Sequence, residues 1–374
     1  MTKEGMRILI APDKFKGTLS AREVADNIAA GLREILPNAR IEIVPMADGG
    51  EGTAEVISQA LGASWVKWKA HDPIGREIEA RYGWIENRQL AVMEMSEAAG
   101  MRRLQPSEYD VDLANTFGLG EMILDAAERG AKQIIIGLGG SATNDGGFGM
   151  ARALGFQFFG SAGEKLDGLK PSSLQELQRV DVPRDLKLPK IIAAVDVRNP
   201  LLGENGATRV FGPQKGATPD QIEILERALA KLADVVAEQF GFDYRNKPGA
   251  GAAGGLGFGL MSFCGATIRP GFDVVAESTG LESKIKDVDL VITGEGSLDR
   301  QTLEGKTPAG VAQLARKLGK RVFAVVGRAA EDREVRQLFD GVYQNARAGM
   351  SQEENMNKAT DLLRENAREL AKSL

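Results

Sequence analysis

Short apolar runs rich in Ile and Val alternate with amphipathic helical patterns along most of this chain, and no other feature of the sequence constrains the fold as strongly. Runs of this length and composition are typical of buried strands. Strands that alternate with helical segments predict α/β units, in which crossover helices join parallel strands. The predicted strands lie at residues 7–11, 41–44, 134–136, 191–195, 290–293 and 322–326.

Capping signals mark the ends of the helical patterns. Ser20 and Glu23 form a capping box, and Thr218 with Gln221 forms a second one, in which Pro219 takes the first helical position. These signals set the boundaries of the segments that join the predicted strands. The predicted helices cover residues 20–36, 218–241, 307–319 and 351–370.

Residues 64–96 follow a different pattern, because apolar and polar residues alternate there with a period of two, as in Ile78, Ala80, Tyr82 and Trp84. This alternation without helices predicts an antiparallel meander. A helix and a strand follow over residues 116–138, which indicates a separate domain with a mixed sheet. We therefore expect a parallel-sheet domain at residues 1–64 and 270–374, interrupted by a second α/β domain at residues 65–269.

Histidine and cysteine are nearly absent: the 374 residues include 45 glycines but only His71 and Cys264. This excludes a disulfide framework, a Cys/His zinc site within one chain, and a serine or cysteine nucleophile with a histidine base other than His71. A net charge of −5 and 6% aromatic residues give no footprint for nucleic acid. No apolar run approaches the ~18 residues of a membrane span, and the first run is too short for a signal peptide. We expect a cytoplasmic protein.

Four apolar runs are followed by a carboxylate: Asp13, Asp48, Asp196 and Glu295. Ligands bind at the carboxyl ends of the strands in open α/β sheets. Glycines gather beside these carboxylates, and glycine-rich turns let backbone amides converge on an anion. The glycine clusters lie at residues 49–53, 137–147, 249–255 and 294–296.

Two glycine clusters match dinucleotide-binding spacing, which leaves a hydroxy-acid dehydrogenase as an alternative. Residues 249–254 spell G-x-G-x-x-G, but no strand precedes them. Residues 137–142 spell G-x-G-x-x-A after a predicted strand, but no acidic residue ends a next strand about 20 residues later, where the ribose partner should lie. Packing of tight turns is the simpler interpretation of the glycines after residue 249.

A nucleoside triphosphate explains the combination of glycines and carboxylates better. Phosphoryl transfer needs backbone amides and a cation on the phosphates, and carboxylates for magnesium or for the acceptor hydroxyl. Candidate cations are Lys14, Lys16, Lys215 and Lys306. Residues 300–307 resemble a Walker A loop in which arginine replaces the first glycine, and they lie between a predicted strand and a predicted helix, as such a loop requires.

With these clusters in view, the chain resembles the bacterial class I glycerate kinase family from about Met6 to its C-terminus. One departure is Lys14, where the family commonly has serine; it leaves Asp13 and Lys16 in place. The segments that carry the resemblance are residues 10–21, 45–53, 137–147, 196–203, 211–217, 248–257 and 290–302.

The resemblance implies transfer of the ATP γ-phosphoryl group to D-glycerate, usually at the 2-hydroxyl, which gives 2-phosphoglycerate. It also implies a flavodoxin-like domain interrupted by a domain of restriction-enzyme-like topology, with the site in the cleft between them. The implied partners are the small molecules ATP, Mg²⁺ and D-glycerate, and a homodimer stays open. Phosphorylation at the 3-hydroxyl and a non-catalytic acid-sensing module remain as further alternatives.

The roles of individual residues are hypotheses from their chemistry. Asp196 or Asp48 would activate the acceptor hydroxyl, and Asp13 and Lys16 belong to the same catalytic group. Glu295 and Asp299 are candidates for magnesium, which prefers one or two carboxylates with phosphate oxygens and water. The nucleotide phosphates would be bound by amides or side chains of Gly49, Gly50, Gly52, Thr53, Gly294, Gly296 and Lys306.

The carboxylate of glycerate needs a cation or a cluster of amides and hydroxyls. Residues of the second glycine cluster and two basic side chains later in the chain could supply them. The candidates are Ser141, Thr143, Asn144, Arg209 and Lys215.

Overall fold

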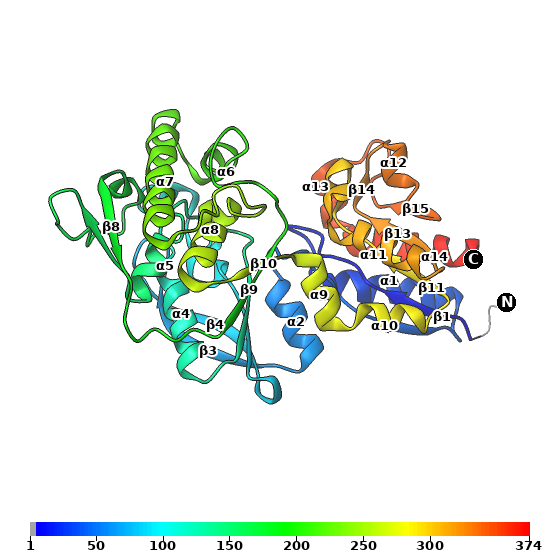
Figure 1. Cartoon of the computed structure of the whole chain (residues 1–374). Coiled ribbons are helices and arrows are strands. Elements are labelled where there is room, and N and C mark those ends of the chain that lie inside the picture. The colour runs from blue at the N-terminus through cyan, green and yellow to red at the C-terminus, as the bar shows by residue number, and fades with distance from the viewer. Residues whose placement is uncertain (1–4) are drawn as a thin grey trace. The chain divides into compact units, whose positions relative to one another are not determined.

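The computed structural model describes residues 5–374 and divides the chain into two compact units (Figure 1). The host unit comprises residues 5–48 together with Phe272–Leu374, and the inserted unit comprises Gly49–Gly271. The division before Gly49 differs from the expected boundary at residue 64, because helix α2 (Thr53–Leu61) packs against strands of the inserted unit. The second division, after Gly271, lies within two residues of the expected boundary after residue 269.

The host unit is built around a parallel sheet of five strands, β1 (Arg7–Ile10), β2 (Arg40–Ile43), β11 (Leu290–Thr293), β13 (Arg321–Val326) and β15 (Gly341–Gln344). The spatial order is β15-β13-β11-β1-β2, and every neighbouring pair is parallel. Numbered along the unit, this is the 2-1-3-4-5 order of flavodoxin-like folds, which confirms the expected fold class. The strand order reverses between β1 and β11, so ligands are expected at the carboxyl ends of these two strands.

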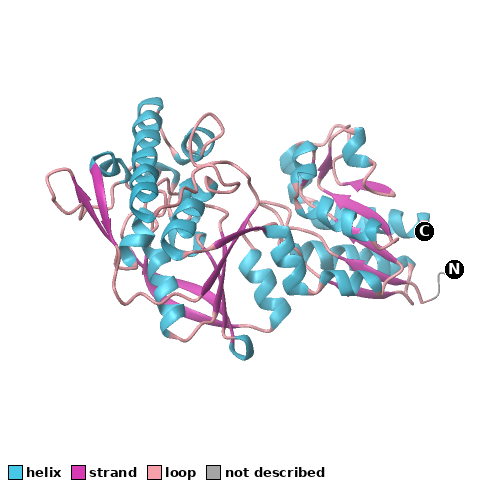
Figure 2. Ribbon diagram, viewed as in Figure 1, coloured by secondary structure: helices cyan, strands magenta, loops and turns pink. Residues whose placement is uncertain are grey.

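Helices accompany the host sheet (Figure 2). The predicted capping box of Ser20 and Glu23 is confirmed at the start of α1, whose apolar stripe packs with α14 over the sheet. The expected single helix at 351–370 is wrong: it breaks at Lys358 into α13 and α14, and only α14 contributes to this core. The host helices are α1 (Ala21–Ile35), α9 (Gly271–Thr279), α10 (Leu281–Lys286), α11 (Thr307–Lys317), α12 (Arg333–Arg336), α13 (Gln352–Asn357) and α14 (Ala359–Ser373).

The inserted unit has a mixed sheet of six strands in the order β10-β9-β6-β5-β4-β3. The predicted meander is confirmed, because β4 pairs antiparallel with both β3 and β5. From β5 to β10 the neighbouring strands are parallel. The strands are β3 (Ser64–His71), β4 (Glu77–Ile85), β5 (Leu90–Glu94), β6 (Gln133–Gly137), β9 (Lys190–Val195) and β10 (Thr267–Pro270), and a separate hairpin is formed by β7 (Gln157–Gly160) and β8 (Leu177–Asp181).

Helices of the inserted unit bury the faces of this sheet in one large apolar core. The second predicted capping box, Thr218 with Gln221, is confirmed at the start of α7. Besides α2, the helices are α3 (Ser96–Ala99), α4 (Phe117–Glu128), α5 (Phe148–Ala153), α6 (Ala207–Phe211), α7 (Pro219–Phe240) and α8 (Ala252–Cys264).

The glycines at the start of α8 serve backbone packing. Ala253, Gly254 and Gly255 adopt left-handed conformations, and a Cβ atom on Gly254 would lie 1.9 Å from the carbonyl oxygen of Thr143. The amide of Gly146 donates to the carbonyl of Gly254 at 3.0 Å. This segment therefore holds residues 143–147 in place, which accounts for glycine after residue 249 without a dinucleotide.

Among residues 5–374, no helix is both long enough and apolar enough to cross a membrane.

Candidate active site

Two of the predicted carboxylates meet at the switch point of the host sheet. Asp13 follows β1 and Glu295 follows β11, and the two loops are joined where the Asp13 amide donates to the Gly294 carbonyl at 2.8 Å. The chain after β2 stays beside them, because the Met46 amide donates to the Pro12 carbonyl at 2.9 Å. Asp48 comes two residues later, so three loops place carboxylates at one edge of the sheet.

Asp13 is buried and bonded at both carboxylate oxygens. Its Oδ1 accepts the backbone amide of Lys14 at 2.7 Å, and its Oδ2 accepts the hydroxyl of Thr307 at 2.6 Å. Burial, with the negative charge of Asp48, raises the pKa of Asp13 to about 7, against the opposing effect of these hydrogen bonds. Asp13 can therefore gain or lose a proton near neutral pH.

Glu295 has a similar environment. The Thr302 hydroxyl donates to its Oε1 at 2.6 Å. Burial raises the pKa of Glu295 to about 7; the Thr302 bond and Lys306 lower it, and the charges of Asp299 and Asp48 raise it further. Asp299 also caps the 3₁₀ turn Arg300–Glu304, because its Oδ1 accepts the Gln301 amide at 3.0 Å. The two residues predicted to bind magnesium, Glu295 and Asp299, are thus close, but the Asp299 carboxylate already accepts a backbone amide of the turn.

The N-terminus of α11 lies beside these carboxylates, because Thr307 is its first residue. Lys306 is the N-cap residue, and its side chain makes no capping hydrogen bond. The Lys306 ammonium lies 3.5 Å from Oε1 of Gln301. Gly296 packs near the backbone of Lys16, whose side chain is exposed, and its carbonyl accepts the Arg328 amide at 3.1 Å.

In the inserted unit, the turn at residues 49–53 packs over the carboxyl ends of the parallel strands. A Cβ atom on Gly139 would lie 2.5 Å from Cα of Gly50, and one on Gly49 would lie 3.0 Å from the backbone of Ala194. The chain's own backbone thus occupies the place that the 137–142 dinucleotide motif would reserve for a pyrophosphate. Asp196 follows β9 at the same edge and is exposed.

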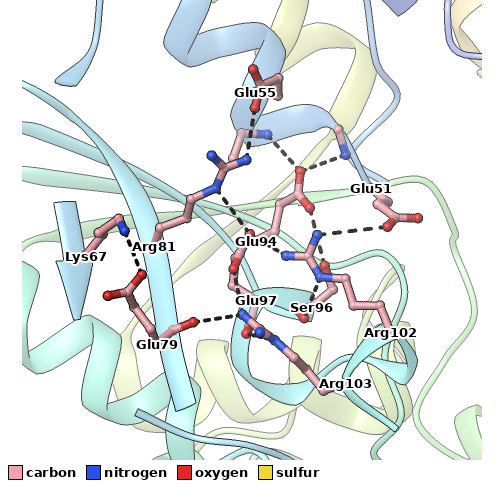
Figure 3. A network of polar contacts seen from close by, with 12 residues as sticks. Glu51, Glu55, Lys67, Glu79, Arg81, Glu94, Ser96, Glu97, Arg102 and Arg103 are labelled. Atoms are coloured by element: carbon pink, nitrogen blue, oxygen red, sulfur yellow. Dashed lines mark hydrogen bonds and ion pairs between the residues drawn. The ribbon is translucent and has the colours of Figure 1, made fainter. Parts of the chain in front are cut away.

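Glu94, at the end of β5, caps this turn from within the protein (Figure 3). Its Oε1 accepts the amides of Gly52 at 2.7 Å and Ala54 at 3.1 Å, at the N-terminus of α2. The Gly49 amide donates to the Thr53 hydroxyl at 3.2 Å, and that hydroxyl donates to the Gly50 carbonyl at 2.7 Å. These groups therefore already have protein partners in the structure, and the hypothesis that Gly49, Gly52 and Thr53 bind phosphate stays a prediction.

Sequence analysis missed Glu94, although it ends an apolar run as the other four carboxylates do. The loop after it is held by an ion-pair cluster around Glu97, which pairs with Arg102 and with Arg103 at 2.9 Å (Figure 3). This loop in turn supports the second glycine cluster, because the Met101 amide donates to the Gly140 carbonyl at 2.9 Å. Glu94 thus lies at the base of a cluster of polar loops formed by residues 94–104 and 137–147, which we call the loop cluster.

Four of the five predicted substrate-binding residues come together in that loop cluster. The Lys215 ammonium is 3% exposed and donates to the Thr143 carbonyl at 2.7 Å and to the Ser141 hydroxyl at 3.3 Å. The Asn144 side-chain amide donates to the Thr208 hydroxyl at 2.9 Å. Burial lowers the pKa of Lys215 to about 7, while the charge of Asp145 opposes this shift.

Asp145 is a second residue that sequence reasoning passed over. It is fully buried, and its carboxylate accepts the amides of Thr116, Gly147 and Gly149 and the Thr116 hydroxyl, at 2.8 to 3.0 Å. These bonds tie the starts of α4 and α5 to the glycine loop. The signal was its place inside the cluster at residues 137–147.

Arg209 does not share this environment. Its guanidinium forms a two-point pair with Glu223 on α7, at 2.7 and 3.1 Å, and lies 4.0 Å from Glu204. No contact joins it to Ser141, Thr143 or Lys215 among the described residues. Its role in substrate binding stays a prediction.

The host unit has a flavodoxin-like sheet with titratable carboxylates at its switch point. It is interrupted by a mixed-sheet unit with a polar loop cluster. These features define an α/β enzyme with ligand sites at strand ends. A model of the glycerate kinase family matches residues 8–374. The chain belongs to the glycerate kinase family, which confirms the resemblance seen in its motifs.

Individual relatives agree with this assignment. A Halalkalibacterium halodurans protein named glycerate kinase is 41% identical over 370 residues, which cover 97% of each chain. An Escherichia coli protein named glycerate 2-kinase is 44% identical over 332 residues, 87% of this chain and 86% of that one. The crystal structure of a Salmonella typhimurium protein assigned as glycerate kinase 2 superposes with a TM-score of 0.86 at 39% identity, covering 99% of this chain and 98% of the other.

Proposed function

We propose that the protein transfers the γ-phosphoryl group of ATP to the 2-hydroxyl of D-glycerate, giving 2-phosphoglycerate and ADP. The observation that carries this proposal is the pair of buried, titratable carboxylates, Asp13 and Glu295, at the switch point of the host sheet. Membership of the glycerate kinase family supports the acceptor, and the relative named glycerate 2-kinase supports the 2-hydroxyl.

The N-terminus of α11 is the proposed binding point for the nucleotide phosphates. Helix N-termini attract anions, because their first amides lack partners within the helix and carry the positive end of the helix dipole. Lys306 adds a cation at this end, and no side chain among those that the structure describes caps the helix. The α2 N-terminus is less suitable, because Glu94 already accepts two of its amides.

Magnesium fits the same edge of the host sheet. The charge of Asp48 raises the pKa of both Asp13 and Glu295, so a bound divalent cation would relieve their mutual repulsion. We assign the ion to Glu295 and Asp48, because Asp13 is the proposed proton acceptor and Asp299 caps the following turn. When bound, magnesium neutralises charge on the phosphates.

Asp13 is the proposed acceptor for the proton that the substrate hydroxyl loses. A general base works best when its pKa lies near the operating pH, and the pKa of Asp13 is raised to about 7. The Thr307 hydroxyl fixes the orientation of the carboxylate at 2.6 Å. Asp196, the alternative from the sequence, is exposed at the end of β9 and stays a hypothesis.

A coupled assay of ADP release tests this proposal. We expect release that depends on D-glycerate, ATP and Mg²⁺ together, with little release when glycerol replaces D-glycerate or when EDTA removes the metal. Absence of ADP release with all three present would refute the proposed reaction. Phosphorus NMR of the product then locates the phosphate, and a 3-phosphoglycerate signal would overturn the assignment to the 2-hydroxyl.

A further inference from the structure

Three buried polar groups in the loop cluster of the inserted unit have no hydrogen-bond partner left for them. The first is on Lys215. A charged ammonium has three protons, and two go to the Thr143 carbonyl and the Ser141 hydroxyl. No other acceptor for it occurs among residues 5–374. In the charged form of Lys215, one N–H is therefore unpaired inside the protein.

The second group is the Thr143 hydroxyl. Ser141 Oγ accepts from Lys215 Nζ at 3.3 Å and from the Thr143 amide at 3.1 Å, so both of its lone pairs are used. Its own proton then points to Thr143, where Oγ1 lies at 3.0 Å and the carbonyl at 3.3 Å. Because the Thr143 hydroxyl cannot donate back to Ser141, its proton lacks an acceptor within the described part of the chain.

The third group is on Asn144, which is 0% exposed. Its Nδ2 donates to the Thr208 hydroxyl at 2.9 Å, and its Oδ1 has no partner. Turning the amide over would exchange the two atoms, but one of them would still lack a partner. The unpaired atom can therefore be served by a hydroxyl, which both donates and accepts.

Unpaired polar groups are rare in protein interiors because each one costs stability. Three of them within Thr143, Asn144 and Lys215 form a complementary set: two donors and one amide atom. A carboxylate offers acceptors for the two donors, and a neighbouring hydroxyl satisfies the amide. The set matches the head of a small hydroxy acid.

We propose that Lys215 and the Thr143 hydroxyl bind the carboxylate of glycerate, and that Asn144 binds the hydroxyl that is not phosphorylated. The inference rests on the proposed function and names the residues that select its acceptor. An amide cannot take up a proton at neutral pH, so Asn144 suits the hydroxyl that keeps its proton. Asn144 is then the specificity determinant for glycerate over acids with a single hydroxyl.

Calorimetric binding of D-glycerate and D-lactate, which lacks the 3-hydroxyl, tests the assignment. N144A should weaken D-glycerate binding by about 10- to 100-fold and change D-lactate binding by less than about threefold, since a site built for a hydroxyl discriminates strongly by it. T143V and K215M should weaken both acids by about the same factor, tenfold or more. Should N144A not fold, N144S serves in its place.

T208V is the matched control, because it removes the protein partner of Asn144 and leaves the amide in place. It should preserve the ratio of the two affinities. Equal weakening of both acids by N144A, or loss of discrimination in T208V as well, would overturn the inference. Failure of the wild-type enzyme to release ADP would instead refute the proposed function, whereas normal ADP release with unchanged discrimination in N144A would refute this inference alone.

Discussion

The two units differ in the buried groups whose pKa is brought to about 7. The host unit buries the carboxylates Asp13 and Glu295, and the inserted unit buries the ammonium of Lys215. Burial disfavours the charged form in each case, so it raises the pKa of the acids and lowers the pKa of the base to about 7. The same physical cause therefore prepares one unit for a cation and the other for an anion.

The helix N-termini of the two units differ in a related way. Among the side chains that the structure describes, none caps α11 in the host unit, whereas Glu94 caps α2 in the inserted unit. A helix end whose amides already bond a carboxylate gains little from a second anion. We therefore assign external phosphate to the host unit.

The largest expected effect is on catalysis by Asp13. D13N keeps the shape of the side chain but removes its capacity to accept a proton, so we expect kcat to fall by about 10²- to 10⁴-fold. ADP release at saturating D-glycerate and ATP measures this. D26N, which removes an exposed carboxylate paired with Arg22 on the surface of α1, is the matched control. A D13N enzyme with kcat within twofold of wild type would remove Asp13 from the mechanism.

The opposite charges of Asp13 and Lys215 predict opposite responses of stability to pH. Asp13 has a folded pKa of about 7, above the ~4 of an unfolded chain, so its ionisation destabilises the fold as the pH rises through this interval. Relative to the wild type, D13N should therefore gain about 4 kcal/mol in free energy of unfolding between pH 4 and pH 8.

For Lys215, the change of stability with pH has the opposite sign. Its folded pKa of about 7 lies below the ~10 of an unfolded lysine, so between these values the unfolded chain binds the extra proton and wild-type stability rises with pH. The free energy of unfolding of K215M relative to wild type should fall by about 2 kcal/mol between pH 7 and pH 9. Urea unfolding of wild type and both variants at pH 5, 7 and 9 measures both trends. Parallel pH curves for the three proteins would contradict the contrast.

Glu94 tests the difference between the helix ends. E94A leaves the amides of Gly52 and Ala54 without their acceptor and should lower the free energy of unfolding by about 1–3 kcal/mol. E94Q keeps an acceptor oxygen and should cost about half as much. Thermal unfolding of both variants checks this order. Equal losses would show that the charge of Glu94, and not its hydrogen bonds, holds the turn.

The host-unit site could largely be predicted from the sequence, because strand order and carboxyl ends follow from local patterns. Asp13 and Glu295 were found in this way. The hydrogen-bond partner of Asp13 could not be predicted, because Thr307 reaches it from 294 positions away in the chain. Glu94 was missed because β5 lies within the antiparallel meander, although its other neighbour, β6, is parallel.

The inserted-unit site shows a different limit of sequence reasoning. Lys215 and Arg209 looked equally suited to bind a carboxylate. Their surroundings separate them: Lys215 reaches a loop 72 positions earlier in the chain, while Arg209 pairs with Glu223 on the next helix. No spacing rule expresses such contacts, because they arise only once the strands have set the loops side by side.

The smallest expected effect concerns the backbone that holds the loop cluster. Ala253 has a φ of 53° and directly precedes Gly254, which packs against the 143–147 segment, and a left-handed conformation costs alanine about 1–2 kcal/mol. A253G removes this strain but gives the unfolded chain more freedom, so we expect a net gain of about 0.5–1 kcal/mol in the free energy of unfolding. A252G, one residue earlier and without a positive φ, should lose stability by a similar amount, and chemical unfolding of the pair measures both. If A253G were the less stable of the two, the Ala253 side chain would be contributing packing that outweighs its backbone strain.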